Sequence, residues 1–228
     1  RVTVVAQQKA VDYQDTEFNV IDLPGVYSLS SQSLDELEAR NYIMHQKPDV
    51  VVNVLDSGNL ERNLFLSTQL IEMGVNVVFV LNMIDEAERK GIDINTKELS
   101  AILKAPVVKF CGRKGDGVDE LLSAIYEQAN KTDEQRNHIQ IAYDDHVEEA
   151  IDEMASKFYD IHEDRMSRED SRWMAIKMLE GDESVLKEEK EHTELLQEIR
   201  SRRETLAEQH DETTEVLISD GRFGFING

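Results

Sequence analysis

Short apolar segments alternate with amphipathic ones over residues 1–130. Val50–Leu55 is nearly continuous in apolar side chains, which is typical of a parallel strand covered on both faces. Similar segments predict strands at Val2–Ala6, Glu17–Ile21, Asn76–Leu81 and Pro106–Phe110, the first two forming a hairpin around Asp12–Asp15. Helical spacing predicts helices at Leu34–His45, Leu60–Glu72, Thr96–Leu103 and Val118–Gln128, with Ser33 and Thr96 as caps. This alternation indicates an α/β fold.

Helical patterns replace strand patterns beyond Asn130. Apolar side chains recur at helical spacing within Ala142–Ile161, Ser171–Leu179 and Glu194–Leu206, and Gly181 fits a helix end. We therefore predict three parts. An α/β domain occupies residues 1–130, a small all-helical domain 131–217, and a tail towards a following domain 218–228.

The chain is strongly acidic, with 25 basic and 47 acidic residues and a net charge of −22. Residues 131–228 carry −14 of that charge. Such a surface repels phosphate backbones and argues against a nucleic-acid partner, although backbone amides can still hold a small nucleotide. The single cysteine, Cys111, fits a reducing compartment, and no apolar run is long enough to span a membrane. The chain opens on Arg1 without a secretory signal, which indicates a piece of a longer protein.

An acid ends the predicted strand Glu17–Ile21 and is followed by a sharp turn. Asp22 stands where a doubly wound sheet places ligand chemistry, and Gly25 lets a backbone N–H approach an anion. Asp-x-x-Gly is the pattern by which P-loop GTPases sense magnesium and the terminal phosphate. Taken alone, the four residues are better explained as an ordinary turn, and only the rest of the chain favours the phosphate-sensing interpretation. The serine-rich segment Val26–Leu34 that follows predicts little apolar burial.

The segment Asn82-Met-Ile-Asp85 also follows a predicted strand. Guanine presents two adjacent donors on one edge, which a fixed Asp85 carboxylate can accept together. Adenine lacks that donor pair, so the site would reject it. Asn82 could bind the purine or tie the loop to its neighbours, and the alternative is that it caps a helix starting at Met83. The loop Gly112–Gly117 could offer N–H groups to the purine O6, or could be a loop made flexible by glycine.

Four motifs together resemble a known family. They are Asp22-Leu-Pro-Gly25-Val-Tyr-Ser28, Ser57-Gly-Asn-Leu-Glu-Arg-Asn63, Asn82-Met-Ile-Asp85 and Arg172-Trp-Met-Ala-Ile-Lys-Met-Leu-Glu-Gly-Asp182. The first three resemble the GTPase domain of the ferrous iron transporter FeoB family, and the fourth resembles that family's helical domain. The resemblance implies a Ras-like P-loop GTPase sheet followed by a helical domain that acts like a nucleotide-dissociation inhibitor.

The same resemblance implies the cofactors and the site residues. GTP or GDP would bind with Mg²⁺, which Thr3 would ligate directly and Asp22 through water, and K⁺ is left open as a further ion. Gly25 would donate to the γ-phosphate. The implied nucleotide-binding residues are Asp22, Leu23, Pro24, Gly25, Asn82, Met83, Asp85, Cys111 and Gly112. No catalytic residue is assigned.

This chain departs from the expected pattern in four places, of which one is Arg1, where the family usually has a glycine two residues before the switch threonine. Met83 stands where Ras-like proteins have a lysine, and Val26 stands where many have a water-orienting glutamine, so unaided hydrolysis should be slow. No Gly-x-x-x-x-Gly-Lys-Ser/Thr motif occurs. We therefore expect the phosphate loop and the central strand before it, between the strands ending at Asp22 and Asp56, to lie upstream of Arg1.

The resemblance implies a GTP-binding, slowly hydrolysing regulatory domain that couples nucleotide state to Fe²⁺ uptake. It would lie on the cytoplasmic face of the bacterial inner membrane, with its own carboxy-terminal membrane permease as partner; a homo-oligomer is left open. One alternative is a stand-alone ribosome-assembly GTPase, for which the acidic helical half offers no RNA-binding surface. Another is an acidic helical interaction or iron-binding module on a degenerate nucleotide fold.

A single Glu-x-x-His pair in the helical half bears on that last alternative. Glu189 and His192 have the spacing found in carboxylate-bridged di-iron bundles. Such a bundle needs two of these pairs, and no second one occurs. Because the neighbouring residues are charged, we interpret this stretch as a solvated helix face.

Overall fold

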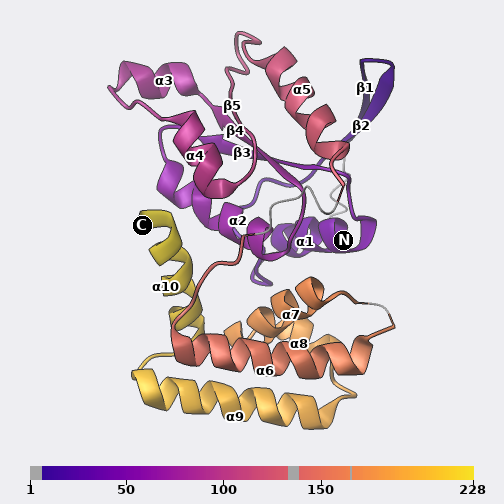
Figure 1. Ribbon diagram of the computed structural model, residues 1–228, viewed down its shortest axis with the longest axis vertical. Coiled ribbons are helices and arrows are strands. Elements are labelled where there is room, and N and C mark those ends of the chain that lie inside the picture. The colour runs from indigo at the N-terminus through magenta and orange to yellow at the C-terminus, as the bar shows by residue number, and fades with distance from the viewer. Residues whose placement is uncertain (1–6, 133–138, 165) are drawn as a thin grey trace. The chain divides into compact units, whose positions relative to one another are not determined.

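The computed structural model describes residues 7–132, 139–164 and 166–228 (Figure 1). The chain forms two compact units. The first unit comprises Arg1–Ser67 and Val75–His138, and the second comprises Thr68–Gly74 and Ile139–Gly228. The predicted Val2–Ala6 strand lies outside the described residues, and so does Thr3.

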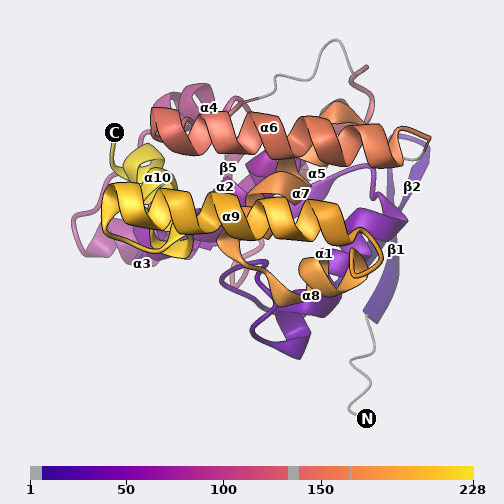
Figure 2. The ribbon, with the colours of Figure 1, turned by 90° about the horizontal axis from the view of Figure 1, so that it is seen from below.

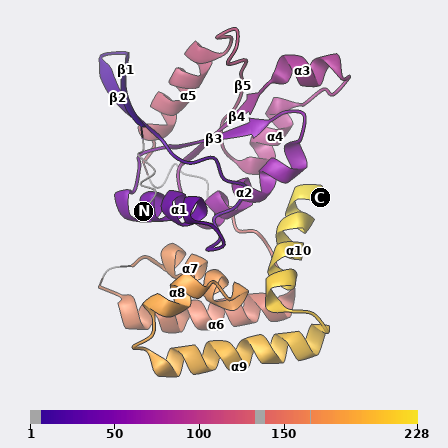
Figure 3. The same cartoon turned by 180° about the vertical axis from the view of Figure 1, so that it is seen from behind.

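The described residues of the first unit form five strands in two separate sheets (Figure 3). β1 (Gln7–Tyr13) and β2 (Thr16–Asp22) are antiparallel, and the turn between them places Gln14 and Asp15 at positive φ. A hairpin is present as predicted, but its described first strand is Gln7–Tyr13, because the turn needs only the two residues Gln14 and Asp15. β3 (Val51–Asp56), β4 (Val77–Asn82) and β5 (Val107–Lys109) are parallel, in the order β3-β4-β5.

The break between the two sheets leaves one side of β3 uncovered. Among the described residues β3 pairs only with β4. Val52 and Val54 are 37% and 54% exposed, so the prediction that this strand is covered on both faces is wrong for the described residues. By contrast, the first five residues of β4 are buried, because β4 is the middle strand and has a neighbour on each side. The break lies between the strands ending at Asp22 and Asp56, where the sequence predicts a missing strand.

Among the described residues of this part of the chain, four helices connect the strands and a fifth follows the last strand. They are α1 (Leu34–Gln46), α2 (Leu60–Glu72), α3 (Ile84–Arg89), α4 (Thr96–Leu103) and α5 (Val118–Ala129). Ser33 caps α1 in a capping box with Glu36, as its sequence predicts. The cap predicted for α4 is wrong by one residue: the side chain of Asn95, not Thr96, accepts the Glu98 N–H.

The second unit is all-helical. It contains α6 (Asp145–His162), α7 (Arg168–Glu180), α8 (Glu183–Glu188), α9 (Thr193–His210) and α10 (Thr214–Asn227). Figures 1 and 2 show α6 and α9 side by side. Every residue of α7 from Trp173 to Leu179 is buried, so this helix lies inside the unit. Gly181 ends α7 in the left-handed conformation, which confirms the predicted helix end.

The carboxyl-terminal residues differ from the expected tail. Residues 218–228 belong to α10 and its cap, and Ile218 and Arg222 are buried one helical turn apart. The glycines at 221 and 224 weaken helix propensity, and burial of this face compensates for them. The last turn of α2, in Thr68–Gly74, also belongs to this helical unit rather than to the α/β unit. The sequence places that turn inside 1–130, because its apolar pattern continues without a break.

Candidate nucleotide-binding site

The polar ends of the parallel strands meet at one edge of the sheet. Asp56 and Asn82 are opposite each other in the β3–β4 register, and Leu81 pairs with Lys109 of β5. Ser57, the first residue after β3, donates both its N–H and its hydroxyl to the Asn82 carbonyl, at 3.1 and 2.6 Å. In an α/β sheet this edge is the usual place for a ligand crevice.

The side chain of Asn82 joins two loops of this edge. Its Oδ1 accepts the N–H of Met83 at 2.9 Å and the N–H of Gly112 at 3.3 Å. Met83 is in the left-handed conformation at φ 56° and itself occupies the cap position of α3, which begins at Ile84. The alternative that Asn82 caps a helix starting at Met83 is therefore wrong, and Asn82 ties its loop to the 111–112 loop.

The Asp85 carboxylate lies between the α3 turn and the loop after β5. Its Oδ1 accepts the thiol of Cys111 at 3.5 Å, and its Oδ2 accepts Nη2 of Arg113 at 3.1 Å. Burial raises the pKa of Asp85, but the Cys111 and Arg113 hydrogen bonds and the charge on Lys114 outweigh it and hold this pKa below its usual value. The carboxylate is therefore ionised at neutral pH.

Arg113 and Lys114 were not among the predicted site residues. Both contact Asp85, and the Lys114 ammonium lies 3.9 Å from Oδ2. The sequence marks the end of β5 as polar, but nothing in its pattern indicates which basic side chain reaches across to α3. The distance of 28 positions between Arg113 and Asp85 is closed only by the β4–β5 pairing.

The glycine-rich loop after β5 has a defined structure. The Cys111 N–H donates to the Asp116 carbonyl, and the Cys111 carbonyl accepts from Lys114 and Gly115. Gly117 has φ 90°, and a Cβ there would lie 2.2 Å from the Lys109 carbonyl oxygen. The Cys111 N–H is thus used within the loop, whereas the Gly112 N–H donates to the Asn82 side chain.

The Asp22–Gly25 loop lies at the end of β2. Asp22 and Gly25 are exposed, and a Cβ at Gly25 would meet nothing within 4 Å. In the part of the chain that the structure describes, no hydrogen bond or ion pair links this loop to Asn82 or Asp85. The two halves of the predicted site are thus present on separate sheets.

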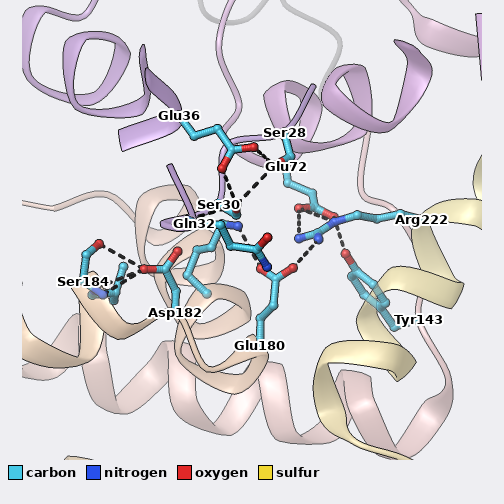
Figure 4. A network of polar contacts seen from close by, with 12 residues as sticks. Ser28, Ser30, Gln32, Glu36, Glu72, Tyr143, Glu180, Asp182, Ser184 and Arg222 are labelled. Atoms are coloured by element: carbon cyan, nitrogen blue, oxygen red, sulfur yellow. Dashed lines mark hydrogen bonds and ion pairs between the residues drawn. The ribbon is translucent and has the colours of Figure 1, made fainter. Parts of the chain in front are cut away.

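The segment after Gly25 is better anchored than its serine content suggests. Leu29 is buried, contrary to the expected lack of apolar burial. The hydroxyls of Ser28 and Ser30 donate to the two Glu36 carboxylate oxygens at 2.6 and 2.7 Å (Figure 4). Burial raises the pKa of Glu36, and these hydrogen bonds with those from Ser33 outweigh it and lower the pKa.

No helix among the described residues is both long and apolar enough to cross a membrane. The fold and its polar strand ends define a protein with an α/β ligand-binding domain and a helical domain. The chain belongs to the FeoB family. A family model of ferrous iron transport protein B matches residues 1–125, and a model of the FeoB cytosolic helical domain matches residues 143–228.

Relatives in two organisms support this assignment. The Fe(2+) transport protein A/Fe(2+) transporter FeoB fusion protein of Porphyromonas gingivalis is 39% identical over 239 residues, covering all of this chain and 28% of the relative. The Fe(2+) transporter FeoB of Salmonella typhimurium is 35% identical over 185 residues, covering 79% of this chain and 23% of the relative. The chain thus spans about a quarter of the length of these relatives.

Solved structures of FeoB cytosolic domains share the fold. The T. maritima cytosolic domain in a GDP form has a TM-score of 0.81 and 30% identity, covering 99% of this chain and 84% of that one. The S. thermophilus domain bound to GDP, AlF₄⁻ and K⁺ has a TM-score of 0.84 and 32% identity, covering 98% and 85%. The predicted fold class, an α/β GTPase sheet followed by a helical domain, is confirmed.

Proposed function

We propose that this chain binds GTP and GDP at the carboxyl ends of its strands, with Asp85 selecting guanine. The observation that carries the proposal is the ionised Asp85 carboxylate, held at the edge where Asn82 joins two loops. A fixed anion at this place suits the paired N1–H and amine donors of guanine. Adenine would leave the carboxylate without those donors.

Guanine binding requires an exchange of partners at Asp85. Arg113 and the Cys111 thiol occupy its two oxygens, so the base donors replace them and Arg113 turns outward. Arg113 is well exposed, which makes that movement inexpensive. Asn82 and the Gly112 N–H then face the purine, and Met83 offers an apolar contact to the plane of the base.

In this proposal the phosphates of the nucleotide bind at the Asp22–Gly25 loop. Asp22 would hold Mg²⁺ through water, Gly25 would donate to the γ-phosphate, and Leu23 and Pro24 shape the turn. Thr3 would be the direct Mg²⁺ ligand. The exposed β3 valines and the break between the sheets support a further strand and phosphate loop that complete this site. Mg²⁺ bound there would neutralise the charge that develops on the phosphates.

We further propose that the chain hydrolyses GTP slowly, because Val26 cannot orient a water molecule as glutamine does. It would act as the cytoplasmic regulatory part of a Fe²⁺ transporter, on the inner membrane and attached to a membrane permease. The relatives named as Fe(2+) transporters support this role. The solved relative with K⁺ supports K⁺ as a further ion. In this proposal the helical unit slows nucleotide release.

Isothermal titration calorimetry with GDP and ATP, on a protein that includes the phosphate loop, tests the nucleotide proposal. We expect GDP to bind with one site per chain and ATP to bind at least ~10-fold more weakly, about 1.4 kcal/mol. A control with poly-uridylate should give no heat, because the protein surface is acidic. Equal affinity for GDP and ATP would contradict a guanine site, and tight RNA binding would favour the ribosome-assembly alternative.

A further inference from the structure

A buried cluster of two histidines and a glutamate lies in the helical unit, separate from the residues assigned to nucleotide. His162 ends α6, Glu189 follows α8, and His192 precedes α9. Nε2 of His162 and Nδ1 of His192 lie 3.0 and 2.7 Å from the same Glu189 oxygen, Oε2. The side chains of His162 and Glu189 are 2% and 8% exposed, and that of His192 is 38% exposed.

The position of Glu189 overturns the expectation of a solvated face. The charged neighbours Lys187, Glu188, Lys190 and Glu191 are exposed as expected, but Glu189 points inward. The third group, His162, lies 27 positions earlier and forms no sequence motif with the other two. The fold, and not the Glu-x-x-His spacing alone, therefore brings the three side chains together.

We propose that His162, Glu189 and His192 form a binding site for a divalent transition-metal ion. Two imidazole nitrogens and one carboxylate oxygen are a donor set that Fe²⁺ and Zn²⁺ both accept. The potential ligand atoms of the three residues lie within 4.8 Å of one another. An ion between them replaces the two hydrogen bonds, and three protein ligands leave coordination positions for water.

The metal needs only a small rearrangement. Ligand atoms about 2.1 Å from a tetrahedral metal ion are about 3.4 Å apart. The two nitrogen-to-oxygen separations are 3.0 and 2.7 Å, so each widens by less than about 1 Å, and the ligand nitrogens of the two histidines already lie within 4.8 Å of each other. His192 is the most exposed of the three and lies between α8 and α9, where it can move outward. Its exposed side also gives an ion a way in.

Charge favours a cation here. Two neutral imidazoles and one carboxylate leave a divalent ion with one net positive charge, in a half of the chain that carries −14. Bound metal would also join the end of α6 to the segment between α8 and α9. Because the ion binds the folded unit, it should raise the unfolding temperature of that unit.

A second cluster of the same composition provides a matched control. Asp144, His146 and His210 also bring one carboxylate and two imidazoles together, with both histidines 3.5 Å from Asp144 Oδ1. Asp144 and His146 are exposed, unlike His162 and Glu189. If composition alone decided metal binding, the two clusters would behave alike. Our proposal assigns binding to the buried one.

Two titrations of the metal-free, nucleotide-free protein test the proposal. In the first, visible absorption spectra monitor the binding of Co²⁺. In the second, calorimetry under anaerobic conditions measures the binding of Fe²⁺. We expect one equivalent of Co²⁺ to give ligand-field bands of a protein-bound ion. Glu189→Gln and His192→Ala should each weaken binding at least ~10-fold, and His146→Ala should leave it unchanged. Circular dichroism checks each variant, and half-exposed His192 provides a substitution that spares the core.

Two results would overturn the proposal. One is the absence of protein-bound Co²⁺ bands and of Fe²⁺ heat in the folded parent protein. The other is binding that survives Glu189→Gln and His192→Ala but is lost in His146→Ala, which would assign the ion to the exposed cluster. Nucleotide binding does not enter either readout, so the result is independent of the guanine site.

Discussion

The guanidinium of Arg222 binds both carboxylate oxygens of Glu72, although the two residues are 150 positions apart. Nε lies 3.0 Å from Oε1 and Nη2 lies 2.9 Å from Oε2. Their side chains are 0% and 2% exposed. This bidentate ion pair links α10 to the last turn of α2 inside the helical unit, in the geometry that arginine and carboxylate prefer.

Three further side chains extend this network, of which Figure 4 labels Glu180 and Tyr143. Nη1 of Arg222 donates to Glu180 at 2.6 Å, and the hydroxyl of Tyr143 donates to Glu72. Burial, and then the charge of Glu72, raise the pKa of Tyr143, so its hydroxyl stays protonated. Lys177, also buried, donates to Glu180 at 2.8 Å. Every charge in the cluster thus has an opposite partner.

Replacing Arg222 with glutamine should destabilise the helical unit by about 3–5 kcal/mol, because Glu72 would keep a buried charge without its cationic partner and Glu180 would keep only Lys177. Urea unfolding followed by the fluorescence of Trp173, the single tryptophan, measures this. Trp173 is buried in α7 and reports on the same unit. The control Arg200→Gln changes an exposed residue of α9 and should stay within about 0.5 kcal/mol. An equally small effect at Arg222 would contradict the assigned role.

Glu180 makes the helical unit sensitive to acid. Burial raises its pKa, but the charges of Arg222 and Lys177 outweigh this and lower the pKa to about 2. A lowered pKa adds stability above the usual value of 4.5, and that stability is lost as the pH falls towards 2. The contribution is about 3 kcal/mol.

The Glu180→Gln variant tests this pH dependence. The free energy of unfolding, measured at several values between pH 5 and pH 2, should fall less steeply in the variant than in the parent. Glu183→Gln is the control, because Glu183 is exposed and its ion pair is with Lys187, which is exposed as well. Identical slopes for the parent and Glu180→Gln would show that Glu180 is not the titrating group.

A methyl group at position 221 should clash with Tyr143. A Cβ there would lie 2.4 Å from Cδ1 of the Tyr143 ring. Gly221→Ala should therefore destabilise the helical unit by about 1–3 kcal/mol in thermal or urea unfolding. Gly224, in the same helix, has nothing within 4 Å of its own Cβ position, and Gly224→Ala should be neutral or stabilising by up to about 1 kcal/mol. The reverse order would mean that Tyr143 does not pack against α10.

Removing residues 131–228 tests whether the helical unit slows nucleotide release. If it does, stopped-flow measurements should show GDP leaving the shortened protein at least about fivefold faster, with both proteins carrying the phosphate loop. Preference for GDP over ATP should persist, which shows that the shortened protein is folded. If the full and shortened proteins both prefer GDP and release it at the same rate, the helical unit does not slow nucleotide release.

Local patterns were enough to predict most of the elements. The helix Leu60–Glu72 was predicted with the observed bounds, because its apolar residues have helical spacing and Gly74 marks its end. A helix near α3 entered only as the alternative starting at Met83, and α8 and α10 were not predicted, since six residues or two internal glycines leave little helical signal. Burial then decides what local propensity does not.

The site contacts that the sequence did not predict are contacts between residues far apart in the chain. Asp85 was predicted to be a site residue, but its contact with Arg113 depends on strand pairing. Likewise Glu189 was placed on a solvated face, because its buried partner His162 belongs to another helix. Arg222 was predicted to lie in a tail, and its partner Glu72 is 150 positions away. A one-dimensional pattern does not contain such pairs.

The most direct test of the guanine site is the affinity of Asp85→Asn for GDP and for xanthosine diphosphate. Titration calorimetry should show GDP binding weakened by at least ~1.4 kcal/mol, about tenfold, and xanthosine diphosphate gaining relative to GDP. The extra carbonyl of xanthine suits an amide donor, which asparagine supplies at the same place. Glu86→Gln, beside Asp85 on α3, should leave both affinities unchanged. GDP binding as tight in Asp85→Asn as in the parent, with no gain for xanthosine diphosphate, would contradict guanine recognition by Asp85.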